Sequence, residues 1–381
     1  MTAVAFYISG HGFGHASRQV EIINRLAARR PDLTILIRTA APRWLLDRTI
    51  KPPFDLEPQP VDTGVAQIDS LHLDAAATIA QAREFYATFE DRAEAEARYL
   101  VERNVVFVVS DAPPLACAAA ARAGVPSVVI SNFTWDWIYE AYELHEGHEG
   151  HEGHEGDTGF IDTIRSAYRD AEAAWRLLMH GGFATFKTIV DVPFVARHAS
   201  YAPEETRRRL GLPSNRRLVL PTFGGYGVDG LKLDALDINT AGSEWQVAQV
   251  ADAAIYDAGL RYEDLVRAVD VVLTKPGYGT LSECIANDTA VVYTSRGHFA
   301  EYDVLVREMP KYLRCAYLDN ESLLAGRWRA ALDAALAAPE PPQHPRSDGA
   351  VIVADMICAR VERRIATLGG SPRRRSTDAV A

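Results

Sequence analysis

Residues 6–30 read FYISGHGFGHASRQVEIINRLAARR and are typical of the first unit of a nucleotide-binding α/β domain. An apolar strand runs into a glycine loop, and a helix with apolar residues at helical spacing follows. Gly10 and Gly12 match the first two glycines of the dinucleotide fingerprint G-x-G-x-x-G, but His15 stands in place of the third. We therefore expect a parallel sheet here, with an imidazole in the first turn of its first helix.

Composition and charge narrow the class of protein. The chain has 381 residues, 48% of them hydrophobic, so two domains with a cleft between them are expected. The net charge of −11 disfavours nucleic-acid and anionic-membrane partners, because both bind positive surfaces. No apolar stretch is long enough for a membrane helix, and no basic region precedes VAFYI as it does in a signal peptide. We expect a cytoplasmic protein without a transmembrane segment, in which the four widely spaced cysteines are buried and reduced.

Strand and helix patterns alternate along the chain, as they do in doubly wound domains. NVVFVVSD, PPLACAAAARAG and PSVVIS repeat the strand–helix–strand order, and the alternation starts again after about residue 205. The predicted fold class is α/β, with two Rossmann-like domains that face a cleft. The predicted boundaries are an N-terminal domain over 1–192, a linker over 193–203, a C-terminal domain over 204–346, a C-terminal helix over 347–367 and a disordered tail over 368–381.

The segment HEGHEGHEGHEG, residues 145–156, has low complexity. Glycine at every third position removes most helix and strand propensity, so we expect a mobile surface loop in the first domain. An extended or 3₁₀-like loop would align His145, His148, His151 and His154, whose imidazoles can hold Zn²⁺ or Ni²⁺. A repeat tolerated in a loop is the simpler explanation, and no metal site is predicted.

Three glycine loops follow predicted strands, in SGHGFGH, FGGYG and KPGYGT. Such loops let backbone N–H groups approach a phosphate, and the following helix adds its positive end. In DVVLTKPGYGTLSECIAN, Gly277 and Gly279 turn the chain, and Thr280 opens a helix that carries Glu283 in its first turn. This order fits a nucleoside-diphosphate site in which Glu283 accepts two ribose hydroxyls. The alternative is a tight turn with Thr280 as N-cap and Glu283 completing a capping box.

The segment SRGHFAEYDVL, residues 295–305, follows the next predicted strand, and its Glu301 and Tyr302 can bond to sugar hydroxyls or form a solvated loop. The run from DVVLTKPGYGTLSE to SRGHFAEYDVL resembles the donor half of GT-B glycosyltransferases, particularly the N-acetylglucosaminyltransferase of peptidoglycan synthesis and the plant galactolipid synthases. GHGFGHASR and SNFTWDWIYE are more similar to the glycosyltransferase-like part of plant L-arabinokinase and to related bacterial and archaeal proteins. These short motifs occur in both halves of the chain.

The resemblance implies roles for residues of the second half. The glycine-rich helix start would bind the nucleotide diphosphate, Glu283 the ribose, and Glu301 with Tyr302 the sugar. Gly224 and Gly225 of FGGYG would lie near the donor phosphates, although the tyrosine that follows them departs from the small residue usual there. The segment AAIYDAGLRYEDL is where the base-contacting loop would fall. No D-x-D pair follows a strand, so we expect N–H groups and the helix dipole to hold the diphosphate without a metal or another cofactor.

The resemblance also gives His15 a role. In the similar inverting enzymes a histidine at this place acts as base or positions the acceptor, whereas without the resemblance a structural histidine is the more usual explanation. An imidazole, with a pKa of about 6.5, can take a hydroxyl proton as the oxygen attacks an anomeric carbon. His11 lies inside the loop and is a candidate acceptor contact. Asp111 can orient His15, because strand ends of a parallel sheet share one rim, or it can cap the following helix.

Three further side chains are acceptor-binding candidates, each with a structural alternative. Trp135 and Trp137 in NFTWDWIYEAY can stack on a sugar or a hydrophobic aglycone, or they can be ordinary core residues. Arg18, in the first turns of its helix, can hold an anionic group of the acceptor or a phosphate, or it can lie at the surface.

The resemblance and these residues together imply an inverting, metal-independent glycosyltransferase of the hexosyl or N-acetylhexosaminyl type. It would use a nucleoside-diphosphate sugar, expected to be a UDP-sugar, and a small-molecule or lipid-linked acceptor, with no nucleic-acid partner. A sugar-nucleotide epimerase shares this architecture but needs further acid and base carboxylates in the cleft. A non-catalytic sugar-nucleotide-binding protein would bind the donor without consuming it. A nicotinamide oxidoreductase fits least, because the fingerprint lacks its third glycine.

Overall fold

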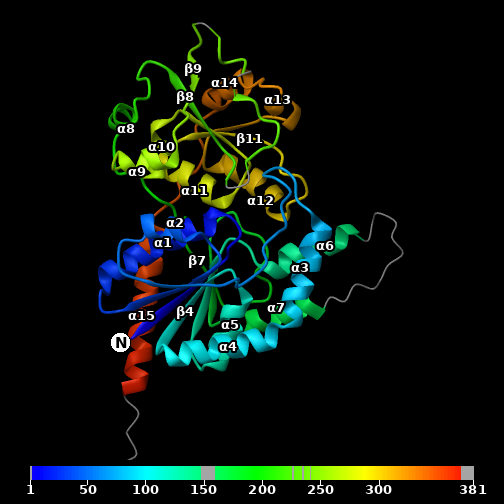
Figure 1. Ribbon diagram of the computed structural model, residues 1–381, viewed down its shortest axis with the longest axis vertical. Coiled ribbons are helices and arrows are strands. Elements are labelled where there is room, and N and C mark those ends of the chain that lie inside the picture. Colours follow the sequence, from blue (N-terminus) through cyan, green and yellow to red (C-terminus); the bar gives the residue numbers. More distant parts are fainter. Residues whose placement is uncertain (1, 147–158, 225–226, 234–235, 241, 370–381) are drawn as a thin grey trace, which may run out of the picture.

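The structure is a computed structural model that describes residues 2–146, 159–224, 227–233, 236–240 and 242–369. Two parallel sheets with helices around them form two domains (Figure 1). The predicted fold class, α/β with two Rossmann-like domains, is confirmed. Gly225, the HEG repeat from residue 147 onward and the predicted tail after residue 369 lie outside the described residues.

The N-terminal sheet has the strand order β3-β2-β1-β4-β5-β6-β7, and its neighbouring strands are parallel. The order reverses between β1 and β4, which leaves a crevice at the carboxyl ends of these two strands. The elements of this half are β1 (Ala3–Ile8), α1 (Phe13–Arg29), β2 (Thr34–Thr39), α2 (Arg43–Thr49), β3 (Asp55–Pro58), α3 (Ala75–Ala87), α4 (Phe89–Glu102), β4 (Val105–Asp111), α5 (Pro114–Arg122), β5 (Ser127–Ser131), α6 (Trp135–Glu146), α7 (Gly159–Arg169), β6 (Ala173–Arg176) and β7 (Ile189–Asp191).

The C-terminal sheet is smaller and has the strand order β12-β11-β10-β8-β9, again with parallel neighbours. Its order reverses between β8 and β10. The elements are α8 (Pro203–Arg209), β8 (Arg217–Thr222), β9 (Trp245–Val247), α9 (Asp252–Asp257), α10 (Tyr262–Ala268), β10 (Val271–Thr274), α11 (Tyr278–Asn287), β11 (Ala290–Tyr293), α12 (Ala300–Glu308), the 3₁₀ turn η2 (Met309–Lys311), β12 (Cys315–Tyr317), α13 (Asn320–Leu324), α14 (Arg329–Ala337) and α15 (Gly349–Gly369).

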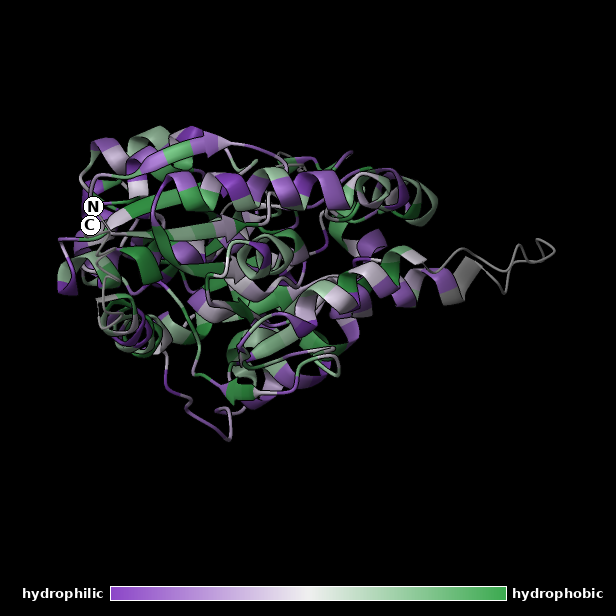
Figure 2. Ribbon diagram, turned by 90° about the horizontal axis from the view of Figure 1, so that it is seen from below, coloured by the Kyte–Doolittle hydropathy of each residue, from purple (hydrophilic) through white to green (hydrophobic). Residues whose placement is uncertain are grey.

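Burial explains why the strands are continuous apolar runs. Every residue of β1 and of β4 is buried, because helices cover both faces of a parallel sheet. Figure 2 shows hydrophobic strands inside the molecule and hydrophilic residues along the outer faces of the helices. The apolar runs in the sequence therefore mark strands that are buried on both faces of the two sheets, and the segments between these runs form the helices that cover them.

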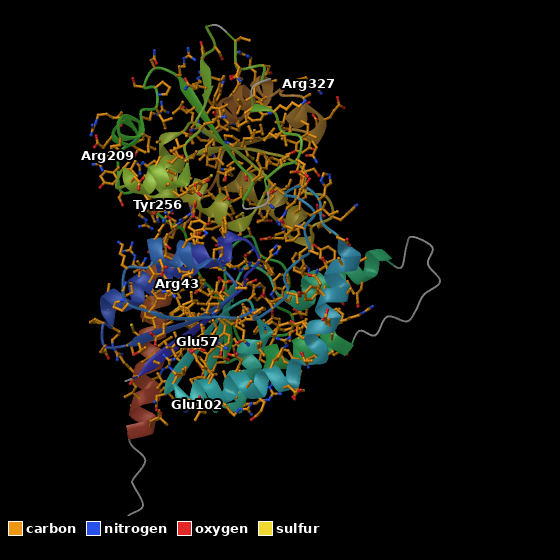
Figure 3. All side chains as sticks on the ribbon, in the orientation of Figure 1. Arg43, Glu57, Glu102, Arg209, Tyr256 and Arg327 are labelled. Atoms are coloured by element: carbon orange, nitrogen blue, oxygen red, sulfur yellow. The ribbon has the colours of Figure 1, made fainter. Side chains whose placement is uncertain are left out.

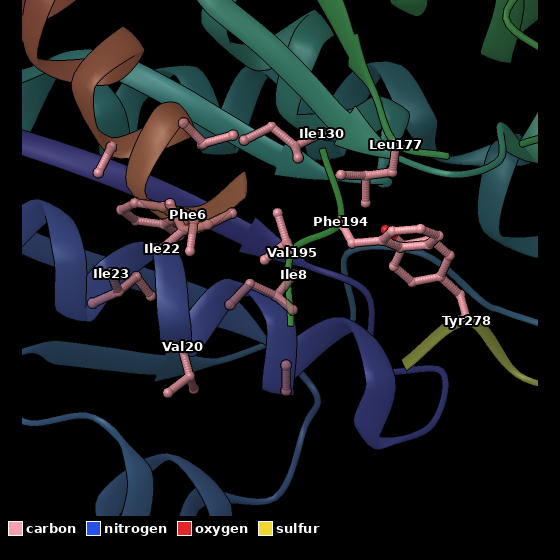
Figure 4. Close-up of a cluster of buried hydrophobic side chains, with 14 of the residues drawn as sticks. Phe6, Ile8, Val20, Ile22, Ile23, Ile130, Leu177, Phe194, Val195 and Tyr278 are labelled. Carbon is pink, nitrogen blue, oxygen red and sulfur yellow. The ribbon is translucent and has the colours of Figure 1, made fainter. Parts of the chain in front are cut away.

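The two domains share one buried cluster where they meet. Residues 192–202 connect β7 to α8, and Phe194 of this connector belongs to the same cluster as Ile8 and Leu177 (Figure 4). Tyr278, the first residue of α11, lies beside Phe194, with ring centroids 5.9 Å apart. The start of α11 is thus positioned by packing against the connector.

The last helix returns to the first domain. α15 packs along α1 and contacts β4, so the chain crosses between the domains twice (Figure 1). Within the described residues, no helix has the length and apolar character needed to cross a membrane. The four cysteines are free: Cys117 and Cys284 are buried as expected, whereas Cys315 and Cys358 are half-buried.

Candidate active site

A cavity of about 400 Å³ lies between the two domains. Its lining residues follow β1 and β5 in the first sheet and β8 and β10 in the second, which places the cavity at the strand-order reversals of both sheets. Its volume is that of a small-molecule site. The sequence-predicted residues that line it are His11, His15, Arg18, Gly224, Gly277, Gly279, Thr280, Glu283 and Glu301.

Helices α1 and α11 both begin at this cavity. Gly12 precedes α1 with a φ of 72°, a left-handed conformation that favours glycine, so the loop turns directly into the helix. Gly279 faces Gly14 across the cleft, and a Cβ added to Gly279 would lie 3.0 Å from the Cα of Gly14. Because no side chain separates them, the unpaired N–H groups and positive ends of two helices border one small volume.

His15 lies in the first turn of α1 and is buried except at the cavity wall. Its Nδ1 lies 2.8 Å from Oδ1 of Asp111, the last residue of β4. Burial by itself would raise the pKa of Asp111, but Arg18 and His15 lower it to about 2. The ionised carboxylate therefore accepts the Nδ1 proton, and Nε2 keeps a lone pair. Because Pro113 is the residue that precedes α5, the alternative that Asp111 caps this helix is wrong.

Arg18 holds Asp111 from the other side. Its Nε donates to Oδ2 at 2.5 Å, its Nη2 donates to Oδ1, and Nε2 of Gln19 donates to Oδ2 at 2.8 Å. Nη2 also lies 2.9 Å from Nδ1 of His15. Since arginine can only donate and Nδ1 carries the proton bonded to Asp111, this approach is a contact rather than a second hydrogen bond. Arg18 is buried, so the alternative of a surface arginine is wrong, and its charge is balanced by Asp111.

Hydrogen bonds continue from Arg18 across the cleft. Its Nη1 donates to Oδ1 of Asn132, just after β5, at 2.8 Å. Nδ2 of Asn132 donates to Oε1 of Glu301, in the first turn of α12 of the other domain, at 2.5 Å. Glu301 is thereby linked to His15 through Asn132, Arg18 and Asp111. Asn132 was not predicted from the sequence, where its signal was its place directly after a strand.

Glu283 lies on α11 and lines the cavity. The helix begins at Tyr278 after Gly277, so Thr280 lies inside the helix rather than at its N-cap, and no side chain caps it. The alternative of a capping box between Thr280 and Glu283 is therefore wrong. The carboxylate of Glu283 instead accepts a hydrogen bond from Nε of Arg197 at 2.6 Å.

Arg197 belongs to a buried cluster that joins the connector to both domains. Its Nη1 lies 3.5 Å from Oε2 of Glu263. Arg261 contacts both Glu263 and Glu21, at 2.5 Å each. Three carboxylates thus share two guanidinium groups. Burial raises the pKa of Glu283 to about 7; Arg197 opposes the rise and Glu263 adds to it.

The raised pKa predicts a pH dependence of stability. Between pH 4.5, the ordinary pKa of glutamate, and about 7, the folded chain keeps a proton on Glu283 that the unfolded chain has lost. The contribution of Glu283 to the free energy of unfolding therefore falls as pH rises through this window, by on the order of 3 kcal/mol in total. Urea unfolding at several pH values should show this fall in the wild type and a weaker one in Glu283→Gln.

The control for this pH series is Glu321→Gln, which removes an exposed glutamate. It should keep the wild-type slope. Equal slopes in the wild type and Glu283→Gln would contradict the raised pKa.

The cavity is also lined by two cationic side chains that were not predicted from the sequence, those of Lys275 and Arg296. Lys275 directly follows β10, and its Nζ donates to Oε1 of Gln67 at 3.3 Å. Burial, with Arg296 nearby, lowers the pKa of Lys275 to about 7. Burial, Arg296, His15 and Lys275 likewise lower the pKa of His11, which is therefore neutral near pH 7. Its place in the sequence, between a predicted strand and a glycine loop, could have identified Lys275 as a candidate binding residue.

Aromatic side chains from both domains also border the cavity. Trp44 of α2 comes from the first domain, and Tyr256 of α9 and Tyr262 of α10 come from the second. Cζ of Arg48 lies 5.1 Å from the ring centroid of Tyr256 and 5.9 Å from that of Trp44. Figure 3 shows Tyr256 on the side of its domain that faces α2. The segment expected to contact a base therefore reaches the cavity.

Four of the predicted residues that the structure describes do not line the cavity: Asp111, which bonds His15 from behind it, and three aromatic residues. Trp135 is fully buried in the first domain, where its Nε1 donates to Oδ2 of Asp62 at 2.9 Å. The ring of Trp137 packs so closely on Gly181 that a Cβ there would lie 2.3 Å from it. Tyr302 is half-buried and packs against the aromatic core of the first domain. The tryptophans therefore stabilise α6 in the core, and Phe133 and Phe299 take the aromatic positions at the cavity.

Metal-ligating side chains do not gather in the described part of the chain. No group of three or more His, Cys, Asp or Glu residues there has the arrangement that could hold an ion.

Comparisons with known proteins identify two curated relatives, while no family model matches the chain. L-arabinokinase from Arabidopsis thaliana is 30% identical over 347 residues, which cover 87% of this chain and 32% of that protein. The uncharacterized glycosyltransferase MK0977 from Methanopyrus kandleri is 30% identical over 221 residues, which cover 52% of this chain and 59% of that protein. The chain thus spans less than two thirds of either relative.

Solved structures resemble the chain over nearly its whole length. The calicheamicin glycosyltransferase CalG4 superposes with a TM-score of 0.61 at 14% identity, over 94% of this chain and 98% of that one. UGT89C1 from Arabidopsis thaliana, complexed with UDP, gives 0.55 at 14% identity, over 97% and 100%. MurG from Acinetobacter baumannii gives 0.51 at 12% identity, over 94% and 99%. At these identities the likeness concerns the arrangement of strands and helices.

Proposed function

We propose that this chain, which has the fold of the GT-B glycosyltransferases, transfers a sugar from a nucleoside-diphosphate sugar to an acceptor hydroxyl. The observation that carries the proposal is the His15–Asp111 pair at the wall of a cavity that the start of α11 also borders. Two structures with this fold contain UDP or UDP-2fluoro-glucose, which supports a UDP-sugar of the hexosyl or N-acetylhexosaminyl type as the donor here.

The proposed reaction is a single displacement. The acceptor oxygen attacks the anomeric carbon and forms the new glycosidic bond, while the bond from that carbon to the β-phosphate oxygen breaks. Nε2 of His15 takes the acceptor proton, and Asp111 stabilises the imidazolium that forms. Attack opposite the leaving group inverts the configuration at the anomeric carbon.

The leaving diphosphate gains one negative charge on the β-phosphate oxygen as the bond breaks, and this charge has partners in the cavity. The unpaired N–H groups at the start of α11 and the positive end of that helix favour an anion. Glu283 would accept the ribose hydroxyls, and Glu301 a hydroxyl of the sugar. We propose that transfer needs no divalent metal.

The donor site is tested by a thermal-shift screen with UDP, GDP, TDP, ADP and their common sugar conjugates. A ligand that binds the native state at ~100 times its Kd stabilises it by ~2.7 kcal/mol. We expect one nucleotide family to raise the melting temperature of the wild type selectively. Glu283→Ala should lose most of this shift, because charge-assisted hydrogen bonds to ribose contribute ~1.5–3 kcal/mol.

The matched control is Glu321→Ala, which removes a glutamate whose side chain is 87% exposed. It should keep the full shift. Repeating the screen with EDTA tests metal independence, since a shift that needs added Mg²⁺ would contradict it. Binding of no nucleotide would overturn the donor site, and a donor that binds but is never consumed with any acceptor would indicate a binding protein.

A further inference from the structure

Arg296 is a buried cation at the cavity: burial lowers its pKa, and the charge of Glu301 opposes this without forming an ion pair among the described residues. The residue is 8% exposed, and within the described residues its side chain makes no hydrogen bond or ion pair. Its Cζ lies 3.7 Å from the ring centroid of Phe299, the residue that precedes α12. Burying a guanidinium group without a hydrogen-bonded anion is costly, so a ligand anion that supplied one would be bound favourably there.

Lys275 lines the same cavity and, like Arg296, forms no ion pair within the described residues. Its one hydrogen bond in the described chain goes to the neutral side chain of Gln67, and no carboxylate lies within ion-pair distance. The charge of Arg296 lowers the pKa of Lys275, and both charges lower the pKa of His11, while Asp69 opposes the effect at Lys275. Within the described residues, neither cation thus forms an ion pair, and Glu301, the carboxylate that acts on Arg296, is hydrogen-bonded to Asn132.

We propose that Arg296 and Lys275 form an anion-binding subsite that takes an oxyanion of the substrate, either the diphosphate of the donor or an acidic group on the sugar. This inference deepens the proposed function and rests on it. Arg18 and Arg197, the other guanidinium groups at the cavity, are already paired with Asp111 and Glu283. If the anion is the diphosphate, the subsite would add full positive charge to the partial positive charge of the α11 helix start. If the anion belongs to the sugar, the subsite would favour a carboxylated sugar over its neutral counterpart.

Calorimetric titrations test the subsite in the wild type, Arg296→Gln and Lys275→Gln. The probes are pyrophosphate, D-glucuronate, D-glucose, UDP-glucose and UDP-glucuronate, at constant ionic strength. We expect each variant to bind the recognised anion about tenfold more weakly or worse, as loss of a charge-assisted bond requires. Arg307→Gln is the matched control, because it removes a guanidinium group of the same domain whose side chain is 66% exposed.

The pattern of losses identifies the source of the anion. Weaker binding of pyrophosphate and of both UDP-sugars would assign the subsite to the diphosphate. Weaker binding of D-glucuronate and UDP-glucuronate alone would assign it to an acidic sugar. Wild-type affinities in both variants, or no binding of any of these anions by the wild type, would overturn the proposal.

Melting of the ligand-free variants separates binding from structure. Replacing an unpartnered buried cation should leave the melting temperature unchanged or raise it, whereas a purely structural Arg296, stacked on Phe299, would lower it. Pyrophosphate and glucuronate carry no base or ribose, so the subsite is tested even if no nucleotide binds. A nucleotide shift that depends on Glu283 but on neither cation would keep the proposed function and overturn this inference.

Discussion

His15→Ala is expected to lower the rate of sugar transfer by ~10²–10⁴-fold, the usual contribution of a positioned general base. The ring is held by Asp111 so that Nε2, rather than Nδ1, keeps the lone pair at the cavity wall. Alanine leaves the hydroxyl proton without an acceptor but does not touch the residues proposed to bind the donor. The effect should therefore fall on kcat, with donor binding within about twofold of the wild type.

The measurement is release of nucleoside diphosphate from the donor that the binding screen identifies, with a panel of hydroxyl acceptors and with water alone. His344→Ala, which removes an exposed histidine, should retain wild-type rates. Added imidazole should restore part of the activity of His15→Ala, because it can enter the space left by the ring. Rates within about tenfold of the wild type in His15→Ala would exclude the role of base.

Asp111→Ala is expected to destabilise the folded protein by ~3–5 kcal/mol, as happens when one partner of a buried ion pair is removed. Asp111 is fully buried and accepts hydrogen bonds from Arg18, Gln19 and His15. Without it the guanidinium group of Arg18 stays buried, and the acceptors left to it among the described residues are the neutral oxygens of Asn132 and Ser131. Urea unfolding measures the change.

Two further variants separate charge from packing at this site. Asp47→Ala removes the carboxylate of an exposed pair with Arg43 and should cost less than ~1 kcal/mol. Asp111→Asn keeps a side chain of the same size and shape, so it should unfold at a higher urea concentration than Asp111→Ala. It should nevertheless lose as much activity as His15→Ala, because an amide does not hold the imidazole in the required tautomer. A loss of stability in Asp111→Ala no larger than that in Asp47→Ala would contradict the buried pair.

Much of the fold was predictable because its signals are local. Apolar runs that end in glycine loops marked β1, β8 and β10, and the resemblance to GT-B glycosyltransferases and to plant L-arabinokinase, carried by short motifs, is confirmed by the comparisons. The meeting of His15 and Asp111 also followed from a simple rule, since strand ends of a parallel sheet share one rim.

Details that depend on packing were predicted less well. The sequence placed the start of α11 at Thr280, but burial of Tyr278 against Phe194 extends the helix to Tyr278. The sequence left Trp135 open between a sugar-binding platform and a core residue, because aromatic residues serve both; its full burial and the bond from its Nε1 to Asp62 place it in the core.

The amino-acid sequence by itself determined the two α/β domains, the glycine loops at the cavity and the place of His15 at a helix start. All of these depend on residues close together in the chain, whose hydrophobic spacing and backbone freedom act locally. Only the tertiary structure decided which charges are paired and which are not. Glu283 bonds Arg197 across 86 residues and Asn132 bonds Glu301 across 169, while Arg296 and Lys275 form no ion pair within the described residues. Such pairings follow from how two domains close on each other, because electrostatic partners are chosen by distance in space and not by spacing along the chain.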